Sequence, residues 1–510
     1  MNQKWAFVVC AVSFGAFLRA TVSLQSFSGA QKPPMFGDFE AQRHWQEITV
    51  NLPMKEWYKN SSDNDLLYWG LDYPPLTAYH SFMCGKVAEL VNQDFVKLHT
   101  SRGISTDTHK LFMRFTVLLA DLLIYLPAVF YGCSAVWKKI PLGQLPSSWK
   151  ILHLILALIF PGQILIDNGH FQYNNISLGL TLWAIATLLH DHLFVATLLF
   201  TLALNYKQMT LYHALPFFFY LLAQCFPSQK RNVTISCGFS RLTGIAAIVL
   251  ITFGILWLPW LTDLIDLSQV VRRIFPIDRG LFEDKVANFW CTFNAIFKFK
   301  DNIPKEKMAL YCLTTTVAAV LPSSINLFIR PNKKNFLLSL VNTSLGFFLF
   351  SFQVHEKSIL LATLPVMLCF PMDPVICFWL LEISSFSMVP LLQKDGLMCA
   401  FMALQGIFLL IVRFYHLVSS RGGKKDTSRN LDLLLLRQFE LGQPSGLMAT
   451  LKIIAFYLSL IGQIALLTGQ ELINPPNHLP YLFPYLISAF SGLHFMAFFL
   501  YFNVKQLFSQ

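Results

Sequence analysis

The chain has 510 residues, of which 55% are hydrophobic and only 13% are charged. Soluble globular domains carry about 25% charged residues, so this chain has roughly half the usual share. With a mean hydropathy of +0.51, the composition excludes a disordered chain, a coiled coil and an ordinary soluble enzyme. The apolar runs are too long and too numerous for soluble cores. We therefore expect an all-α polytopic membrane protein with a single domain over residues 1–510.

The net charge of +11 arises from 39 Lys and Arg against 28 Asp and Glu. A basic isoelectric point is typical of nucleic-acid binding, but no basic patch is sustained on a polar domain, so we expect no nucleic-acid partner. The bias of Lys and Arg toward the cytoplasmic loops of membrane proteins explains the excess better. The ten cysteines are scattered and form no CxxC pair, so we predict neither a disulfide framework nor a zinc site.

The apolar runs predict roughly fourteen membrane spans, although several are shorter than the ~20 residues that cross ~30 Å of hydrocarbon. The first run is preceded only by Lys4 and lacks a small-residue cleavage site, so we expect it to be a retained signal anchor. The predicted spans lie at 5–24, 111–136, 151–166, 176–189, 193–204, 211–226, 242–261, 307–329, 336–352, 357–371, 375–392, 396–418, 448–468 and 481–502.

With the N-terminus in the cytosol, four connections between spans are rich in Lys and Arg, as the positive-inside rule requires of cytosolic loops. These predicted cytosolic loops are 137–150, 227–241, 330–335 and 419–447. Acids and histidines gather instead on the connections assigned to the opposite side. Those connections are a large first loop at 25–110, a second large loop at 262–306, and two short ones at 167–175 and 353–357.

The first polar motif, GDFEAQRHW at 37–45, is typical of a helix start, with Asp38 at or near the N-cap. On that helix Glu40 would face His44 four residues on, while Asp38 and Arg43 would share one side. An amphipathic surface helix with a capping Asp explains the same pattern, since capping residues are far commoner than catalytic acids. A catalytic or binding role for these four residues is the second interpretation.

The second motif, WGLDYPPLTAYH, contains two consecutive prolines, which fix an extended turn and keep the preceding backbone out of a helix. This turn would hold Asp72 rigidly just outside the membrane. A substrate-binding Asp72 and a plain turn before a helix explain the motif equally well.

The third motif, DNGHFQYNN, connects two apolar runs and includes Asp167, His170 and Gln172. A tight turn between helices tolerates Asn and Gly without any further role. Unpaired polar groups at membrane depth are costly, however, and Asp167 and His170 lie only three residues apart. We therefore favour a substrate-binding role for the three side chains.

The fourth candidate is the charged stretch within 262–306. Arginines near a membrane surface suit a phosphate or pyrophosphate, because Arg binds these groups bidentately. A charged loop with internal ion pairs is the alternative. The candidate phosphate ligands are Arg272 and Arg273, and the candidate substrate ligands are Glu283 and Asp284.

The fifth candidate, His355-Glu356-Lys357, lies at the mouth of a predicted span. His355 and Lys357 are candidates for binding a phosphate, although basic side chains beside lipid headgroups often only snorkel. Lys207 and Arg102 are further cations, and a structural role suits them better. The sequence contains no HExxH or Walker motif, so neither a metal site nor a cofactor is expected.

Five motifs in this order, GDFEAQRHW, YWGLDYPPLTAYHS, DNGHFQYN, FEDKVANFWC and FSFQVHEK, closely resemble a known family. It comprises the endoplasmic-reticulum glucosyltransferases of asparagine-linked glycosylation. The resemblance runs from about residue 20 to the last predicted span. Because EAQRHW and LTAYHS are both present, the chain is more similar to the member that adds the first glucose than to the sister that adds the second.

The resemblance implies a GT-C type fold in the endoplasmic-reticulum membrane, with the active site facing the lumen and short helices in the first lumenal loop. It also implies a dolichyl phosphate glucose donor and a dolichyl pyrophosphate nine-mannose acceptor, both held among membrane lipids. In this class an acid of the first lumenal loop is the general base, which here is Asp38, and His355 matches a histidine near the donor phosphate. The assignments of Asp72, Arg272, Arg273 and Glu283 rest on loop position as much as on the motifs.

The chemistry of the residues agrees with a metal-independent, inverting single displacement. A phosphate leaving group departs as an anion and needs no general acid, so one carboxylate suffices to deprotonate the acceptor hydroxyl. Basic side chains would stabilise the developing phosphate charge. Four aromatic residues could stack on sugars or anchor at the interface, namely Trp45, Trp69, Tyr73 and Trp290.

A lipid-linked sugar transporter is the main alternative, and a receptor or structural membrane protein is the third. A transporter would place ionisable residues near the middle of its spans and contain paired broken helices. Here the acids cluster in loops on one side, which favours an enzyme.

Overall fold

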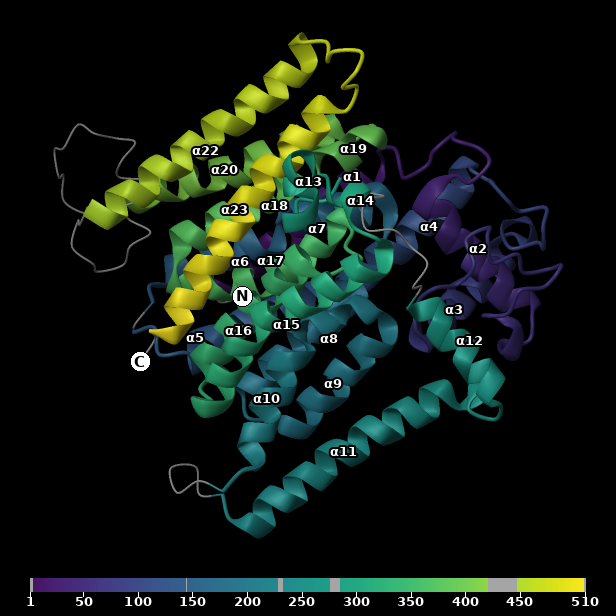
Figure 1. The fold of residues 1–510 in the computed structure, drawn as a ribbon, viewed down its shortest axis with the longest axis horizontal. Coiled ribbons are helices and arrows are strands. Elements are labelled where there is room, and N and C mark those ends of the chain that lie inside the picture. The colour runs from purple at the N-terminus through teal and green to yellow at the C-terminus, as the bar shows by residue number, and fades with distance from the viewer. Residues whose placement is uncertain (1–2, 144, 228–232, 276–284, 421–446, 509–510) are drawn as a thin grey trace.

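The computed structural model describes residues 3–143, 145–227, 233–275, 285–420 and 447–508, and it is built from α-helices joined by short turns, as the sequence predicts (Figure 1). The helices are α1 (Gln3–Ser23), α2 (Gly37–Asn51), α3 (Pro75–Val91), α4 (Asp107–Ala120), α5 (Leu126–Lys139), α6 (Ser147–Leu158), α7 (Pro161–Ile164), α8 (Asn174–Leu189), α9 (Leu193–Tyr206), α10 (Ala214–Cys225), α11 (Ile235–Trp257), α12 (Leu264–Ile274), α13 (Phe289–Phe297), α14 (Phe299–Asn302), α15 (Lys305–Ile329), α16 (Lys333–Phe350), α17 (Ile359–Cys369), α18 (Pro374–Ser387), α19 (Val389–Lys394), α20 (Met398–Ser420), α22 (Leu447–Leu472) and α23 (Leu482–Leu507). Short 3₁₀ or π turns are η1 (Met54–Glu56), η2 (Gln93–Phe95), η3 (Asp121–Tyr125), η4 (Leu165–Phe171), η5 (Gln208–His213), η7 (Leu258–Trp260), η8 (Glu356–Ser358) and η9 (Phe370–Met372).

Eight helical stretches in the described part of the chain are long and apolar enough to cross a membrane. They are Trp5–Ser23, Asp107–Lys139, Ser147–Phe171, Ile235–Trp260, Lys305–Ile329, Pro374–Lys394, Thr450–Leu472 and Leu482–Leu507. Three shorter apolar helices accompany them, at Asn174–Leu189, Leu193–Tyr206 and Met398–Val412. Each predicted span overlaps helical structure, but the count of fourteen is not confirmed, because several of these helices fall short of the ~20 residues of a full crossing.

Contacts between described residues join connections that the predicted alternation of spans puts on the same side. At the end assigned to the cytosol, Lys333 forms an ion pair of 2.7 Å with Asp191 in the short turn between α8 and α9. At the other end, Lys357 reaches both the first large loop, at Asp38, and the 167–175 connection, at His170. The sorting of loops into two groups therefore agrees with the tertiary contacts.

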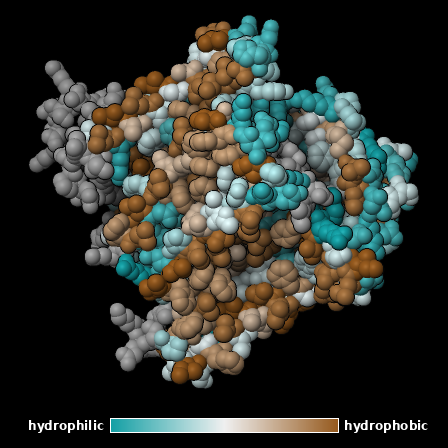
Figure 2. All heavy atoms as spheres, in the orientation of Figure 1, coloured by the Kyte–Doolittle hydropathy of each residue, from teal (hydrophilic) through white to brown (hydrophobic). Residues whose placement is uncertain are grey.

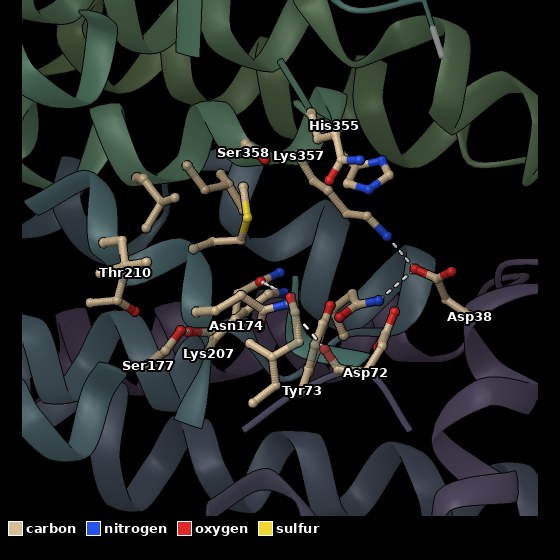
Figure 3. Close-up of a pocket in the computed structure, with 18 of the residues that line it drawn as sticks. Asp38, Asp72, Tyr73, Asn174, Ser177, Lys207, Thr210, His355, Lys357 and Ser358 are labelled. Carbon is tan, nitrogen blue, oxygen red and sulfur yellow. Dashed lines mark hydrogen bonds and ion pairs between the residues drawn. The ribbon is translucent and has the colours of Figure 1, made fainter. Parts of the chain in front are cut away.

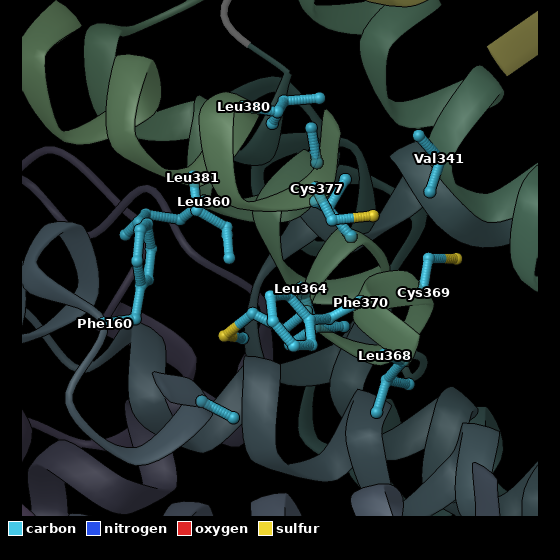
Figure 4. Packing of buried hydrophobic residues seen from close by; sticks show 14 of the residues in the cluster. Phe160, Val341, Leu360, Leu364, Leu368, Cys369, Phe370, Cys377, Leu380 and Leu381 are labelled. Atoms are coloured by element: carbon cyan, nitrogen blue, oxygen red, sulfur yellow. The ribbon is translucent and has the colours of Figure 1, made fainter. Parts of the chain in front are cut away.

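The centre of the bundle is an apolar core in which α8, α17 and α18 are almost completely buried. Every residue of α17 is buried, as expected for a helix that is apolar on all sides. Its side chains pack against neighbouring helices around Phe160, Cys369 and Cys377 (Figure 4). All ten cysteines are free thiols in the structure.

Helix α11 lies along the outside of the bundle and leaves most of its apolar side chains uncovered (Figure 1). Only 6% of the residues in its most apolar stretch are buried. Leu250, Ile251 and Ile255 are among the exposed residues of this helix. Hydrophilic side chains gather instead over α2, α3 and the turns between them (Figure 2). An exposed apolar helix is a lipid-facing surface in a membrane protein, so the two views together separate a lipid-facing side from a polar end.

The first large loop folds into α2 and α3, which confirms that it contains short helices. Every residue from Phe39 to Thr49 in α2 is buried, including the charged ones. The interpretation of 37–45 as an amphipathic surface helix is therefore wrong. Phe36 is the N-cap residue and Asp38 lies in the first turn of α2, so the prediction that Asp38 lies at or near the N-cap is confirmed.

Candidate active site

A cavity of about 800 Å³ lies where the start of α2 meets the turns η4, η5 and η8. Its polar lining includes six of the residues singled out from the sequence, which are Asp38, Asp72, His170, Gln172, His355 and Lys357. Its apolar lining includes Met209, Leu211, Phe347, Leu360 and Leu361. A cavity with one polar and one apolar part suits a ligand with a polar head and a hydrocarbon tail.

The position of Asp38 follows from a sharp reversal of the backbone just before α2. Phe36 and Gly37 both have positive φ, of 58° and 74°. A side chain at position 37 would come within 2.7 Å of the Ser28 hydroxyl oxygen, so the close approach requires glycine there. The same hydroxyl accepts a hydrogen bond of 3.2 Å from the backbone N–H of Asp38. The carboxylate is thus held by backbone geometry as well as by its own contacts.

Three side chains contact the same oxygen of the Asp38 carboxylate. His170 Nε2 lies 3.0 Å from Oδ2, and both Gln172 and the Lys357 ammonium donate to this oxygen. Among the described residues, no hydrogen bond to Oδ1 is found. One carboxylate oxygen is therefore bound by protein donors, while the other is left for a ligand.

The charge state of Asp38 follows from these neighbours. Burial raises the pKa of this carboxyl, but the charges of Lys357 and His170 outweigh burial and hold the pKa well below its ordinary value. Asp38 is therefore an anion at neutral pH. An ionised carboxylate in a partly enclosed cavity is suited to accept a proton from a bound hydroxyl group.

The turn η4 places His170 and Gln172 opposite Asp38. Arg114 binds the turn through its backbone, because its guanidinium donates to the carbonyl oxygens of Asn168 at 2.7 Å and Gly169 at 2.8 Å. Asp167 accepts a hydrogen bond of 2.7 Å from the backbone N–H of Asn175 and does not line the cavity. Asp167 therefore stabilises the turn, while His170 and Gln172 face the cavity.

Lys207 is a cavity residue to which the sequence analysis gave a structural role. Its ammonium donates to Asn174 Oδ1 at 2.6 Å and lies 4.7 Å from the centre of the Tyr73 ring. Figure 3 shows Lys207 beside Asn174 and away from Asp38. A lysine directly after an apolar helix at membrane depth is the sequence signal for this role, because such a cation is costly unless it has a partner.

Lys357 does not snorkel to a membrane surface. Its side chain extends from η8 into the cavity, with His355 beside it, and ends at Asp38 (Figure 3). Its ammonium also lies 3.1 Å from His170 Nε2. Lys357, Lys207 and His355 thus line one cavity, where they provide positive charge for an anionic group.

Glu40, Arg43 and His44 form a buried ionic network behind the cavity, and they do not line it. Arg43 Nη2 lies 2.6 Å from Glu40 Oε1 and 2.7 Å from Glu47 Oε2. His44 lies 3.1 Å from Glu47, so its ion-pair partner is Glu47, whereas Glu40 pairs with Arg43. Burial raises the pKa of Glu47, but its contacts with His44 and Arg43 lower the pKa to about 2. The network therefore holds α2 in place.

The loop that carries Asp72 is held by Arg273. The Arg273 guanidinium donates to the backbone carbonyls of Gly70 at 2.6 Å and Leu71 at 3.2 Å. Neither Arg273 nor the exposed Arg272 lines the cavity. Of the four predicted phosphate ligands, the structure therefore places His355 and Lys357 in the cavity lining but not the two arginines. Glu283 and Asp284 lie outside the described residues.

Three of the four aromatic candidates line the cavity, namely Trp45, Trp69 and Tyr73. The Trp45 indole donates to the backbone carbonyl of Trp69 at 2.8 Å, which orients the Trp45 ring against the Asp72 loop. Trp290 does not line the cavity, because its indole donates to Phe350 O at 2.9 Å elsewhere in the fold. Within the described ranges, no group of three or more His, Cys, Asp and Glu side chains is arranged to hold a metal ion.

The fold and the site together define a polytopic membrane enzyme in which one ionised carboxylate lies among cations at the end of a helix bundle. The model of the ALG6, ALG8 glycosyltransferase family matches residues 11–502. The chain belongs to this glycosyltransferase family, as its five motifs predict.

Curated relatives match over almost the full length. A protein of Gallus gallus named dolichyl pyrophosphate Man9GlcNAc2 alpha-1,3-glucosyltransferase is 46% identical, over 98% of this chain and 97% of the relative. Relatives in Drosophila melanogaster and Arabidopsis thaliana carry the same name, preceded by "probable". The Drosophila melanogaster relative is 46% identical over 99% of each chain. The Arabidopsis thaliana relative is 39% identical over 98% of this chain and 89% of the relative.

Proposed function

We propose that this protein transfers the first glucose from dolichyl phosphate glucose onto the dolichyl pyrophosphate nine-mannose oligosaccharide, in α-1,3 linkage. The acceptor and the linkage are those in the names of its relatives. The structural observation that carries the proposal is the Asp38 carboxylate, which is ionised and has three donors on Oδ2. The donor is proposed from the chemistry of the cavity and from the family resemblance.

In the proposed reaction, Asp38 Oδ1 removes the proton from the acceptor hydroxyl as that oxygen attacks the anomeric carbon of glucose. The bond from the anomeric carbon to the phosphate oxygen breaks, and dolichyl phosphate leaves with the electron pair. The proton remains on Asp38 until product release. One displacement inverts a β-linked donor into an α-linked product.

The leaving phosphate gains negative charge, and the cations of the cavity are placed to stabilise it. Lys357 and Lys207 both line the cavity with His355. Ammonium groups held in place before the reaction lower the energy of a developing anion without reorganisation. We therefore propose that transfer needs no metal ion, and that it continues in the presence of a chelator such as EDTA. Loss of transfer in EDTA would contradict this part of the proposal.

Both proposed substrates carry a polyprenyl tail, which fits the apolar part of the cavity lining. Met209 and Leu211 belong to η5, and Phe347 lies near the end of α16, so this part of the cavity borders the helix bundle. A site at the end of a membrane bundle can bind polar heads while their tails remain in lipid. We propose the endoplasmic-reticulum membrane as the location, with the cavity facing the lumen.

The test is transfer by the purified full-length protein in lipid nanodiscs, with dolichyl phosphate glucose and the nine-mannose acceptor. Wild type is expected to form the glucosylated product, and Asp38→Asn is expected to lose about 10²- to 10⁴-fold in kcat, the usual contribution of a general base. Asp94→Asn is the matched control, because Asp94 is an exposed acid of the same loop and does not line the cavity. Transfer by Asp38→Asn at the wild-type rate would remove the base assignment.

The same assay separates the alternatives. Transfer onto an acceptor that already carries one glucose, but not onto the unglucosylated acceptor, would identify the sister activity. Absence of any transfer, together with movement of a lipid-linked sugar between leaflets of a vesicle, would identify a transporter.

A further inference from the structure

We propose that Asp395 positions His170 as a hydrogen-bond donor to Asp38, so that the three side chains act as one unit in glucosyl transfer. This inference rests on the proposed function and adds to it a residue that the sequence analysis did not single out. Asp395 lies directly after α19, and His170 and Asp38 precede it by 225 and 357 positions in the chain.

The imidazole of His170 lies between two carboxylates. Its Nδ1 lies 2.6 Å from Asp395 Oδ2, and its Nε2 lies 3.0 Å from Asp38 Oδ2. The exposed fractions of the His170 and Asp395 side chains are 3% and 5%, so water does not replace either contact. A neutral imidazole donates from one nitrogen only. If that nitrogen were Nδ1, the lone pair on Nε2 would point toward the Asp38 carboxylate and the Lys357 ammonium, which lies 3.1 Å away, and His170 would give Asp38 no hydrogen bond. An imidazolium donates to both carboxylates and fits both distances.

The fold holds Asp395 in place through the end of α19. Gly396 has a φ of 71°, its N–H donates to Gln393 O at 3.1 Å, and Leu397 N–H donates to Leu392 O at 2.9 Å. These two bonds are a Schellman motif, which ends the helix at Asp395 and requires a residue such as glycine at the next position.

The residue after this motif packs onto the turn that carries His170. A side chain at Gly169 would come within 3.0 Å of Leu397 Cδ1, so the two segments are in close contact. On the opposite side, the Lys32 ammonium donates to Lys394 O at 2.6 Å and ties the end of α19 to the first loop. The contacts of the residues before and after Asp395 therefore hold its backbone next to the turn that carries His170.

The charges around His170 balance only if Asp395 is counted. Asp38 and Asp395 are the anions, and His170 and Lys357 are the cations, so the cluster is neutral before the reaction. Other charged groups nearby are Arg114, which acts electrostatically on Asp395, and Lys207, on which Asp38 acts in turn. His355 lines the same cavity.

This balance has a mechanistic consequence. When Asp38 takes up the acceptor proton, the cluster gains one positive charge at the moment when the departing phosphate gains one negative charge. Without the Asp395 carboxylate, His170 would lose the partner that keeps it protonated, and Asp38 would lose one of the cations that keep it ionised.

The experiment is a double-mutant cycle in the nanodisc assay, with Asp395→Asn, His170→Gln and the double variant. If Asp395 acts through His170, Asp395→Asn is expected to lower kcat about 10-fold or more in the wild-type background and to have no further effect in the His170→Gln background. The acid limb of the kcat profile is expected to move to higher pH in Asp395→Asn, by about one unit or more. The KM for the donor is expected to stay the same.

A purely structural role predicts a different pattern. Equal losses in both backgrounds, or a loss of kcat that does not depend on pH, would overturn the proposal. Asp395→Glu keeps the charge and is expected to recover part of the activity, whereas Asp191→Asn, at the other end of the bundle, is expected to behave as wild type. If Asp38→Asn abolishes transfer and Asp395→Asn does not affect it, only this inference fails. If wild type transfers no glucose, the proposed function fails and this inference fails with it.

Discussion

The ammonium of Lys357 contacts the carboxylate of Asp38 although the two residues are 319 positions apart in the chain. Lys357 comes from the turn η8 and Asp38 from the first turn of α2, so the contact joins the first large loop to the helix bundle. The same ammonium lies near His170. This ion pair is the point at which three distant segments assemble one site.

Removing the Lys357 charge should therefore change the pH dependence of transfer as well as its rate. Burial raises the pKa of Asp38, whereas Lys357 and His170 lower it, so without Lys357 that pKa would be higher. A group with a lowered pKa stays ionised until the pH falls well below its ordinary value, so wild type should keep its activity down to acidic pH. In Lys357→Met the acid limb of the kcat profile should move upward, with a loss of about 10²- to 10³-fold at neutral pH.

The matched control for that change is Lys333→Met. Lys333 pairs with Asp191 at the opposite end of the bundle, so its removal should leave the pH profile unchanged. An acid limb that stays at the wild-type position in Lys357→Met would show that Lys357 does not set the ionisation of Asp38.

Lys207→Met should weaken binding of the phosphate group. Lys207 lines the cavity and is buried, and a charge-assisted hydrogen bond contributes about 1.5–3 kcal/mol. We expect inhibition by dolichyl phosphate to weaken by about 10- to 100-fold. The KM for the donor should rise in the same direction, and Lys207→Arg should retain part of the affinity. An unchanged inhibition constant in Lys207→Met would place the phosphate elsewhere in the cavity.

Glu47→Gln should destabilise the folded protein, although Glu47 lies in the network behind the cavity and does not contact substrate. The pKa of Glu47 is lowered from 4.5 to about 2, so its ionised form stabilises the folded state. That stabilisation is fully present above pH 4.5 and is lost as the pH falls toward 2. Its size is about 3 kcal/mol, because one pKa unit corresponds to about 1.4 kcal/mol. Thermal melting in detergent should show a lower Tm for Glu47→Gln than for wild type at pH 7. The difference between the two Tm values should become smaller as the pH falls toward 2.

Asn60 tests the orientation in the membrane. The sequence Asn60-Ser61-Ser62 is a glycosylation acceptor, and Asn60 is exposed in the first large loop. If this loop faces the lumen, the protein made in cells should lose mass on treatment with an N-glycosidase, and Asn60→Gln should abolish that shift. A second acceptor at Asn232 lies outside the described residues and in a loop assigned to the cytosol, so Asn232→Gln should change nothing. Glycosylation at Asn232 instead would invert the topology.

Local sequence patterns determined the membrane class, the positions of the helices and the family, and they predict the side to which each connection belongs. These properties follow from apolar run length, from the placement of Lys and Arg, and from contiguous motifs, all of which are local in the chain. The prediction that Asp38, His170, Gln172 and Lys357 belong to one site also came from motifs, and the structure places all four around one cavity.

Only the tertiary structure decided which polar groups face that cavity. It shows that Glu40, Arg43 and His44 belong to a buried ionic network behind the cavity. It also shows that Arg273 donates to the backbone of the loop that carries Asp72. It also brought Lys207 into the site and set Asp395 against His170. The reason is that a side chain's direction depends on the rotation of its helix and on the turn that ends it. Helix rotation and turn geometry depend in turn on packing between segments hundreds of residues apart. The spacing of residues along the chain does not specify that packing.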